Sequence, residues 1–191
     1  MDIENVAAGA EQFTANAWLV EGTALVDAGS DPVVLERLES AELETVVITH
    51  SHHDHIENLE TVVAEHNVTV HAFEPGNLPV DAERLDDGDE IELAGHTFDV
   101  YHTPGHRDDH VCLYDAEERV LFSGDLIFPG GAFGRTDLEQ GDRDRLIDSI
   151  ERIAALDVRA MYAGHGDAAT DEVNEQIGQS LAAARRREPK Y

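Results

Sequence analysis

The first half of the chain alternates short apolar runs with turn residues, in an order that predicts a hairpin, a helix and a buried strand. Two apolar runs, 17–20 and 23–26, are separated by a Glu-Gly pair, which is typical of a β-hairpin. A helix is expected after Pro32, where apolar residues recur at helical spacing. The β-branched run 45–49 then predicts a buried strand that ends directly before His50.

The second half repeats this order. Runs 111–114 and 119–122 predict a second hairpin, which ends in Ser-Gly-Asp. A helix with one apolar face is expected over 143–156, and a strand over 158–162 ends shortly before His165. Each half is therefore predicted to contain a hairpin, an aspartate, a helix, a strand and a histidine, in that order.

Further elements complete the predicted fold. Strands near 68–71, 89–93 and 97–102 are expected to extend the sheets, and the tail 170–187 has a helical pattern. Since no linker-like segment interrupts the pattern, we expect a single domain over residues 1–191. The predicted fold class is α/β, with two mixed β-sheets flanked by helices in a four-layer helix–sheet–sheet–helix sandwich, because this layering buries every apolar face.

Composition narrows the setting of the protein. The chain has 41 acidic and 13 basic residues, a net charge of −28, and Lys190 as its one lysine. Such a charge repels nucleic acid and anionic lipid, so neither is an expected partner. An acidic, lysine-poor composition resembles that of cytosolic proteins from extreme halophiles. No apolar run is long enough to span a bilayer, and the first ten residues lack a signal-peptide pattern. With one cysteine excluding a disulfide framework, we expect a cytoplasmic protein.

One short segment concentrates side chains that bind metals. In an extended chain, side chains two residues apart point the same way, so His50 and His52 can bind one ion. The chain must then turn into a helix near Glu57, which would direct Asp54 and His55 at a second ion. Imidazole and carboxylate ligands suit Zn²⁺ and also Fe, Mn or Co. The segment comprises His50, Ser51, His52, His53, Asp54 and His55.

Three more candidate ligands lie downstream, each beside a glycine at a predicted strand end. They are His106 in Thr-Pro-Gly-His, Asp125 in Ser-Gly-Asp and His165 in Gly-His-Gly. Glycine at such a position lets the backbone approach a crowded site. By this spacing alone, a metal role for the three competes with ordinary turns at strand ends.

Taken together, these motifs resemble the metallo-β-lactamase superfamily over nearly the whole chain. The resemblance implies an αβ/βα sandwich with two metal ions at one edge, between the sheets. By motif position it implies a first ion held by His50, His52 and His106, a second held by Asp54, His55 and His165, and a bridging Asp125. It also implies that Asp27 orients a ligating imidazole, although Asp27 could instead close a turn. His53 occupies the variable position of the motif.

The implied activity is hydrolysis. Two adjacent ions can share one water, lower its pKa and supply a bridging hydroxide at neutral pH, while one ion polarises a carbonyl oxygen. Asp54 and Asp125 are the expected catalytic carboxylates. A thioester is an easy target because its thiol leaves with a pKa of about 8.5. The expected cofactor is a pair of Zn²⁺ ions, with Fe or Mn as alternatives.

A second segment, Gly134–Leu138 with Gln140-Gly141-Asp142, resembles the glyoxalase II-like branch, the hydroxyacylglutathione hydrolases and their short relatives. Persulfide dioxygenases share it. Arg135 could meet a carboxylate on a thiol carrier or pair with Asp137, and His110 is a candidate for supporting the ligands from behind or for lining the pocket. Few residues follow His165, so the C-terminal helical domain of full-length glyoxalase II is expected to be missing, and a thiol smaller than glutathione or a different ester is a possible substrate.

The leading hypothesis is therefore a dinuclear zinc hydrolase that cleaves a small-molecule hydroxyacyl thioester. The second is a persulfide (sulfur) dioxygenase with a single Fe²⁺. A metal-dependent ribonuclease is third, and the missing basic surface argues against it at low salt. The sequence leaves the oligomeric state open, a homodimer included.

Overall fold

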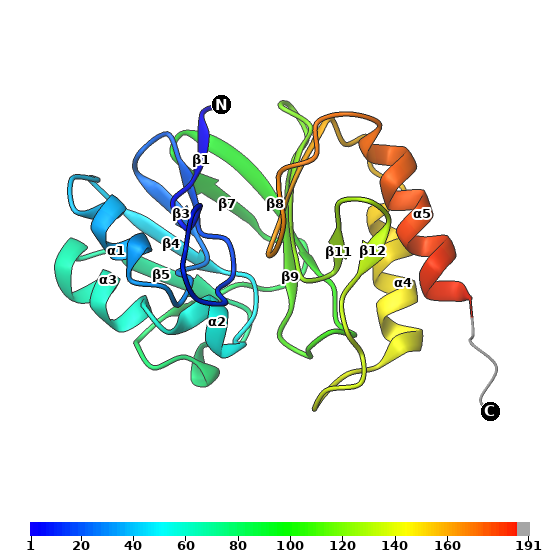
Figure 1. Cartoon of the computed structure of the whole chain (residues 1–191), viewed down its shortest axis with the longest axis horizontal. Helices are drawn as coiled ribbons and strands as arrows, with labels where there is room; N and C mark the ends of the chain where they lie inside the picture. The colour runs from blue at the N-terminus through cyan, green and yellow to red at the C-terminus, as the bar shows by residue number, and fades with distance from the viewer. Residues whose placement is uncertain (187–191) are drawn as a thin grey trace.

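Two β-sheets lie face to face in the middle of the molecule, and helices cover the outer side of each (Figure 1). The computed structural model describes residues 1–186. The first sheet has six strands in sequence order: β1 (Ile3–Asn5), β2 (Trp18–Val20), β3 (Ala24–Val26), β4 (Thr45–Ile48), β5 (Thr69–Ala72) and β6 (Glu83–Arg84). The second has five in the order β13 (Ala160–Ala163), β10 (Val120–Gly124), β9 (Val111–Asp115), β8 (His96–His102) and β7 (Glu90–Leu93). Both sheets contain parallel and antiparallel pairs, which confirms the predicted fold class.

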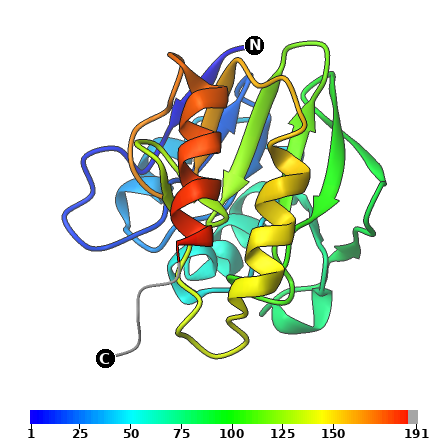
Figure 2. The same ribbon diagram turned by 90° about the vertical axis from the view of Figure 1, so that its right-hand side faces the viewer.

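The helices form the two outer layers. On the first sheet lie α1 (Val33–Leu38), α2 (His53–Ile56) and α3 (Leu59–His66), and on the second lie α4 (Arg143–Ile153) and α5 (Val173–Arg185). Figure 2 shows α4 and α5 side by side on the outer face of the second sheet. Among the described residues, no helix has the length and apolar content that crossing a membrane requires.

Three apolar clusters fill the spaces between the four layers. The central one joins the two sheets and includes Trp18, Phe98 and Phe122, which are nearly inaccessible to solvent. A second cluster packs α1 and α3 on the first sheet, and a third packs α4 and α5 on the second. Burial of apolar surface on both faces of each sheet explains why the strands were recognisable as continuous apolar runs.

The repeated order of the two halves is present in the structure. Hairpins β2–β3 and β9–β10 are antiparallel, and β4 and β13 each join their hairpin as a parallel strand. The first turn has Glu21 and Gly22 at positive φ, the geometry that matches the twist of a tight hairpin. Helix α4 ends at Ile153, three residues before the predicted end at Leu156. The predicted tail helix corresponds to α5, and its predicted last residue, Arg187, lies outside the described residues.

The helix expected near Glu57 begins earlier. The chain is extended at His52 and helical from His53, so Asp54 and His55 lie in the first turn of α2. Sequence patterning did not indicate this because histidine and aspartate carry no apolar periodicity. It also missed β1, β6, the short hairpin β11 (Ile127–Phe128) and β12 (Ala132–Phe133), and the 3₁₀ turn Pro75–Asn77, which are all two or three residues long.

Candidate metal centre

The predicted ligands meet at one edge of the sandwich, where α2 contributes Asp54 and His55. His50 follows β4, Asp125 follows β10 and His165 follows β13, so each leaves the carboxyl end of its strand. In α/β sheets these ends lie at the same edge and form the usual binding crevice. His106 enters from the loop between β8 and β9. The topology therefore gathers residues that are more than one hundred positions apart.

Ligand atoms converge in three overlapping groups. Within each group the nearest nitrogen or oxygen atoms lie within 4.8 Å of one another. The groups are His50–His52–His106, His50–His55–Asp125 and Asp54–His55–His165. All seven predicted ligands are thus brought together, and the first and third groups are the two triads expected from the sequence. His53 belongs to none of them, and its imidazole is 79% exposed beside Glu57.

Individual contacts match the spacing of atoms around a shared cation. His52 Nδ1 lies 3.0 Å from His50 Nε2 and 2.9 Å from His106 Nε2. Asp125 Oδ2 lies 3.5 Å from His106 Nε2 and 3.6 Å from His165 Nε2, so this carboxylate faces both triads. Ligands on a tetrahedral ion with bonds of about 2.0–2.1 Å lie about 3.4 Å apart. The position of Asp125 therefore suits the predicted bridge.

The outward nitrogens fix the tautomers of three histidines. His55 Nδ1 lies 2.8 Å from Asp27 Oδ2, and His106 Nδ1 lies 2.8 Å from the carbonyl of Arg135, so each nitrogen must carry the proton and donate it. Thr49 Oγ1 donates its only proton to Asp27 and therefore accepts from His50 Nδ1 at 3.1 Å. In the neutral form of each ring, Nε2 is then the nitrogen without a proton, and it faces the cluster. A metal ligand needs this neutral tautomer.

Asp27 connects these anchors. Its buried carboxylate accepts from the Thr49 amide at 2.8 Å, from the Thr49 hydroxyl at 2.8 Å and from His55 Nδ1. Asp27 also has φ 61°, a left-handed conformation that aspartate tolerates better than most residues. The structure therefore shows Asp27 orienting an imidazole of the cluster, and it also ends the hairpin strand.

The electrostatics of the cluster favour a cation. Burial lowers the pKa of His50 well below its ordinary value and lowers that of His52 to about 4, aided by neighbouring histidines. At His55 burial also favours the neutral ring, but Asp27 and Asp125 together outweigh it and raise the pKa well above the ordinary value. Burial alone would raise the pKa of the Asp125 carboxyl. The hydrogen bond and charge of His55, together with the other nearby histidines, outweigh burial, so the pKa lies below its ordinary value. Negative potential is thus focused between His55 and Asp125.

Two buried polar atoms, 3.5 Å apart, support the fit of the cluster to metal ions. His55 Nε2 and Asp125 Oδ1 have no hydrogen-bond partner, although buried polar groups rarely lack one. Gly164 shapes the same spot, because a Cβ there would lie 2.1 Å from Asp125 Oδ1 and 2.8 Å from His55 Cε1. Unpartnered lone pairs of nitrogen and oxygen, packed around a space that glycine keeps open, are the donor set that a metal ion satisfies.

His110 supports Asp125 from behind. The Asp125 amide donates to His110 Nε2 at 2.9 Å, so Nδ1 carries the proton and donates to Thr103 Oγ1 at 2.8 Å. Burial lowers the pKa of His110 to about 3, so the ring is neutral at ordinary pH. His110 was a candidate either to support the ligands from behind or to meet the substrate; it is buried behind Asp125 and does not line the pocket. We call Asp27, Thr49, Thr103 and His110 the inner network.

Asp109 is a functional candidate that sequence analysis missed. Its buried carboxylate accepts from Ser51 Oγ, from Asn77 Nδ2 at 3.0 Å and from Arg107 Nε at 3.1 Å. It therefore ties the loop of His106 to the middle of the His50–His55 segment. The charged residues after His106 were the available signal, but sequence could not show which of them turns inward.

A pocket of about 550 Å³ opens over the cluster. Besides His52, Asp54, His106, Asp125 and His165, it is lined by Phe13, Phe128, Leu138, Arg135 and His53. Phe13 stacks on the His165 ring with centroids 5.2 Å apart. The guanidinium of Arg135 forms two hydrogen bonds with Asp137, of 3.0 and 2.8 Å. Of the two interactions considered for Arg135, the structure shows the pairing with Asp137.

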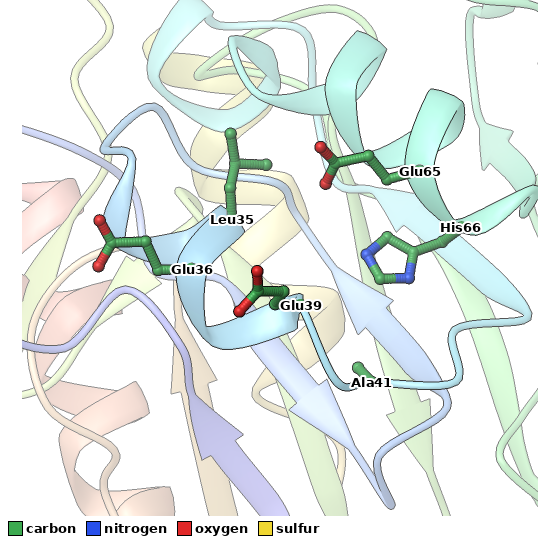
Figure 3. Close-up of a pocket in the computed structure, with 6 residues that line it drawn as sticks. All are labelled: Leu35, Glu36, Glu39, Ala41, Glu65 and His66. Atoms are coloured by element: carbon green, nitrogen blue, oxygen red, sulfur yellow. The ribbon is translucent and has the colours of Figure 1, made fainter.

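A second hollow, of about 530 Å³, lies between α1 and α3 (Figure 3). Glu36, Glu39, Glu65 and His66 line it together with Leu35 and Ala41. Its polar side chains do not converge: among residues 1–186, groups of three ligand atoms close enough for a metal occur only in the pocket cluster. This hollow therefore offers no comparable chemistry.

Comparison with known proteins identifies the family. The model of the metallo-beta-lactamase superfamily matches residues 10–165.

The chain belongs to the metallo-β-lactamase superfamily.

Curated relatives of this superfamily member include hydroxyacylglutathione hydrolases. The one from Pseudomonas entomophila (strain L48) is 35% identical over 161 residues, which cover 78% of this chain and 60% of the relative. The one from Chromohalobacter salexigens is 34% identical over 145 residues, covering 74% and 56%. The chain thus spans about half to three fifths of the length of these relatives. These similarities agree with the resemblance of its motifs to the glyoxalase II-like branch.

Solved structures of similar size share the fold over almost their whole length. The BLEG-1 B3 metallo-beta-lactamase is 28% identical, with a TM-score of 0.77, over 95% of this chain and 97% of that chain. The protein TTHA1623, solved in a di-iron-bound form, is 27% identical, with a TM-score of 0.73, over 94% and 96%. The sandwich of this chain therefore corresponds to nearly the whole length of both structures.

Proposed function

We propose that this protein is a dinuclear metallohydrolase that cleaves thioesters. The observation that carries the proposal is the pair of ligand triads, joined by Asp125, at the floor of one open pocket. The hydroxyacylglutathione hydrolases among its relatives support a thioester as the substrate. The di-iron form of TTHA1623 supports room for two ions in a chain of this architecture.

The residues would hold the ions in two sets that share one carboxylate. His50, His52 and His106 would hold the first ion, Asp54, His55 and His165 would hold the second, and Asp125 would be shared between them. When bound, the ions lower the pKa of a water so that it is a nucleophile at neutral pH, and they polarise the thioester carbonyl. We propose Zn²⁺ as the resident metal, because mixed nitrogen and carboxylate donors suit it, with iron or manganese as the alternatives that metal analysis would reveal.

The protein's own residues supply orientation and proton placement. Asp27, Thr49 and the Arg135 carbonyl hold three imidazoles as the tautomers that turn Nε2 inward. Asp54 lies at the pocket surface, 3.2 Å from His165 Nε2. Burial alone would raise the pKa of its carboxyl, but the nearby histidines outweigh burial and lower the pKa, so Asp54 remains a carboxylate that can contact the second ion. The departing thiolate needs little protonation because the pKa of an ordinary thiol is about 8.5. No additional general acid is therefore required.

One sample tests the proposal against its alternative. Metal content and thiol release from S-lactoyl thioesters are measured on the same purified protein, together with oxygen uptake on addition of a thiol persulfide. Two ions per chain, thiol release and no oxygen uptake are expected. One iron per chain with oxygen uptake would instead establish a dioxygenase, and the absence of thiol release from every thioester would refute the hydrolase.

Adjacent histidines provide a matched control for the metal set. His52→Ala should reduce the metal content to about one ion per chain or less, because His52 Nδ1 contacts two other ligand nitrogens. His53→Ala should retain two ions because the exposed ring belongs to no ligand group. Equal metal loss in both variants would contradict the assigned ligand set.

We further propose that the protein works in a salt-rich cytoplasm. With a net charge of −28, the acidic side chains repel one another at low ionic strength. About 1 M salt shortens the screening length to about 3 Å and so weakens this repulsion. A reducing compartment also suits Cys112, which forms no disulfide and whose buried thiol has its pKa raised by burial to about 12. Thermal unfolding in 0.1–3 M KCl tests the adaptation to salt. The unfolding midpoint should rise with KCl concentration, and a midpoint that stays constant or falls would contradict the proposal.

A further inference from the structure

The pocket over the ligands has an apolar side next to His165, where Phe13 and Phe128 lie with ring centroids 5.2 and 6.1 Å from that of the imidazole. Among residues 1–186, the only exposed large hydrophobic side chains are Phe13, at 79% exposure, and Leu138, at 39%. Both line the pocket of the candidate metal centre, together with the partly buried Phe128. We call Phe13, Phe128 and Leu138 the apolar wall. In a chain of charge −28, two exposed apolar side chains that border one pocket indicate a binding surface.

The fold holds Phe13 in this exposed position. The Asp31 carboxylate accepts from the amides of Glu11 and Gln12 at 3.1 and 2.9 Å. The Phe13 carbonyl accepts from Ser30 Oγ at 3.1 Å, and Thr14 Oγ1 accepts from the Ser30 amide at 2.7 Å. One face of the Phe13 ring packs on His165, and the side chain remains largely open to solvent. An aromatic ring anchored at a pocket mouth is available to a ligand without reordering the loop.

The same pocket offers no free positive charge to an anionic substrate. Its one guanidinium, on Arg135, is engaged by Asp137 through two hydrogen bonds, and both side chains are exposed. The exposed imidazole of His53 lies 3.3 Å from Glu57. A substrate carboxylate in the pocket would therefore compete with Asp137 for Arg135 and with Glu57 for His53. The net charge of −28 also repels anions from the protein as a whole.

From these observations we infer that the substrate carries an uncharged, apolar group beside its scissile bond and that this group packs against the apolar wall. The inference rests on the proposed thioester hydrolysis and specifies the class of thioester. The apolar group is on either the acyl or the thiol side. The inferred specificity excludes thiol carriers that are recognised by their carboxylates, so glutathione thioesters should be poor substrates.

A series of synthetic thioesters tests the inference. Acetyl, butanoyl and hexanoyl esters of N-acetylcysteamine vary the acyl side, and acetyl esters of alkanethiols vary the thiol side. The value of kcat/KM should rise by about fourfold for each methylene on the side that contacts the wall. Succinyl esters should be at least about tenfold slower than butanoyl esters of equal length, and glutathione esters slower than matched N-acetylcysteamine esters.

Alanine variants test whether the apolar wall causes the increase in kcat/KM per methylene. Leu138→Ala and Phe13→Ala should reduce the increase per methylene, whereas Leu35→Ala, in the hollow of Figure 3, should leave it unchanged. Calorimetric binding of non-hydrolysable alkyl ketone analogues provides a second readout, in which the heat capacity change becomes more negative with chain length. In Phe13→Ala this dependence should weaken even if turnover is affected for other reasons.

The outcomes separate the inference from the proposed function. Thiol release with no dependence on chain length, or with a preference for succinyl or glutathione esters, would overturn the apolar specificity and leave the hydrolase intact. Absence of thiol release from all thioesters would refute the hydrolase. In that case, analogue binding that fails to strengthen with chain length, or strengthens equally in Phe13→Ala, would also refute the apolar wall as a binding surface.

Discussion

The buried and the solvent-facing sides of the candidate centre are built on different physical principles. The inner network contacts the cluster through charged or neutral hydrogen bonds that are short and fully buried. In the apolar wall, Phe13 and Leu138 expose their side chains to solvent, and Phe128 is partly buried. Rigid hydrogen bonding fixes which nitrogen faces the metal, and an exposed apolar surface adapts to a ligand. The comparison indicates that chemistry depends on the inner side and selectivity on the outer side.

The largest expected effect comes from filling the space that glycine keeps open. In Gly164→Ala the new Cβ would overlap Asp125 Oδ1 and displace the shared carboxylate. Displacements of about 1 Å at a reacting centre lower rates by about 100-fold, so kcat/KM should fall by at least that much, with loss of bound metal. Kinetics and metal content are the measurements. Gly178→Ala is the control, because nothing lies within 4 Å of a Cβ there, and it should be neutral or slightly stabilising.

The next effect tests the inner network through its carboxylate. Asp27→Asn replaces an oxygen that accepts from both Thr49 and His55 by a group that can donate, so the His55 ring loses its anchor. Metal affinity should fall by about 10- to 100-fold in a chelator competition assay. Asp31→Asn alters a carboxylate that also accepts several amides but lies outside the cluster. An equal loss of affinity in Asp31→Asn would show that the fall is not specific to the imidazole anchor.

A smaller effect concerns stability and its pH dependence. His110→Leu leaves the Asp125 amide and the Thr103 hydroxyl without this partner, which costs about 1–3 kcal/mol and lowers Tm by about 2–12 °C. The folded-state pKa of His110, about 3, lies below its unfolded value near 6.5. The unfolded chain therefore binds the extra proton between these values, and wild-type stability falls as the pH drops below about 6.5.

Comparison of the wild type with His110→Leu isolates the contribution of His110 to the loss of stability at low pH. His110→Leu should lose less stability than the wild type between pH 6.5 and 4.5, because its unfolded chain has one fewer imidazole to protonate. Denaturant unfolding of the metal-free proteins at several pH values measures it. Parallel stability curves would contradict the buried neutral ring. His66→Leu, in the hollow of Figure 3, is the comparison for loss of a histidine outside the centre.

The smallest effect sharpens the role of the outer side. Asp137→Asn releases the Arg135 guanidinium at the pocket wall. The rate with a succinyl thioester should then rise by about twofold to fivefold relative to the butanoyl thioester, and the gain should shrink with added salt. Unchanged relative rates would show that Arg135 does not reach the substrate even when free. Steady-state kinetics at two ionic strengths provide the measurement.

Much of the fold was predictable because its elements carry strong local patterns. The run before His50 is β-branched and buried in β4, and the helix over Arg143–Ile153 has one apolar face on the second sheet. The start of α2 at His53 was misplaced, since metal-binding residues occupy positions where apolar periodicity would otherwise mark a helix. Short strands such as β11 and β12 were missed because two residues contain no readable period.

The candidate site divides in the same way. The chemistry of the seven residues is recognisable from their types and spacing, and the family resemblance assigns them to two sets. The burial of His110 behind Asp125, the inward turn of Asp109 and the contribution of Phe13 to the pocket depend on segments distant in sequence. Local patterning contains no information on such contacts, because they are decided by how the two halves pack.

What the sequence by itself determined is therefore the order of elements, the family and the set of metal-binding side chains, since each depends on residue identity and local spacing. Tertiary structure alone decided the tautomers of the histidines, the pairing of Arg135 with Asp137 and the apolar wall of the pocket. These features depend on which acceptor lies beside a nitrogen and which side chain covers a surface. Both are set by the conformation of the loops at the edge of the sandwich, where strand ends and loops distant in sequence come together.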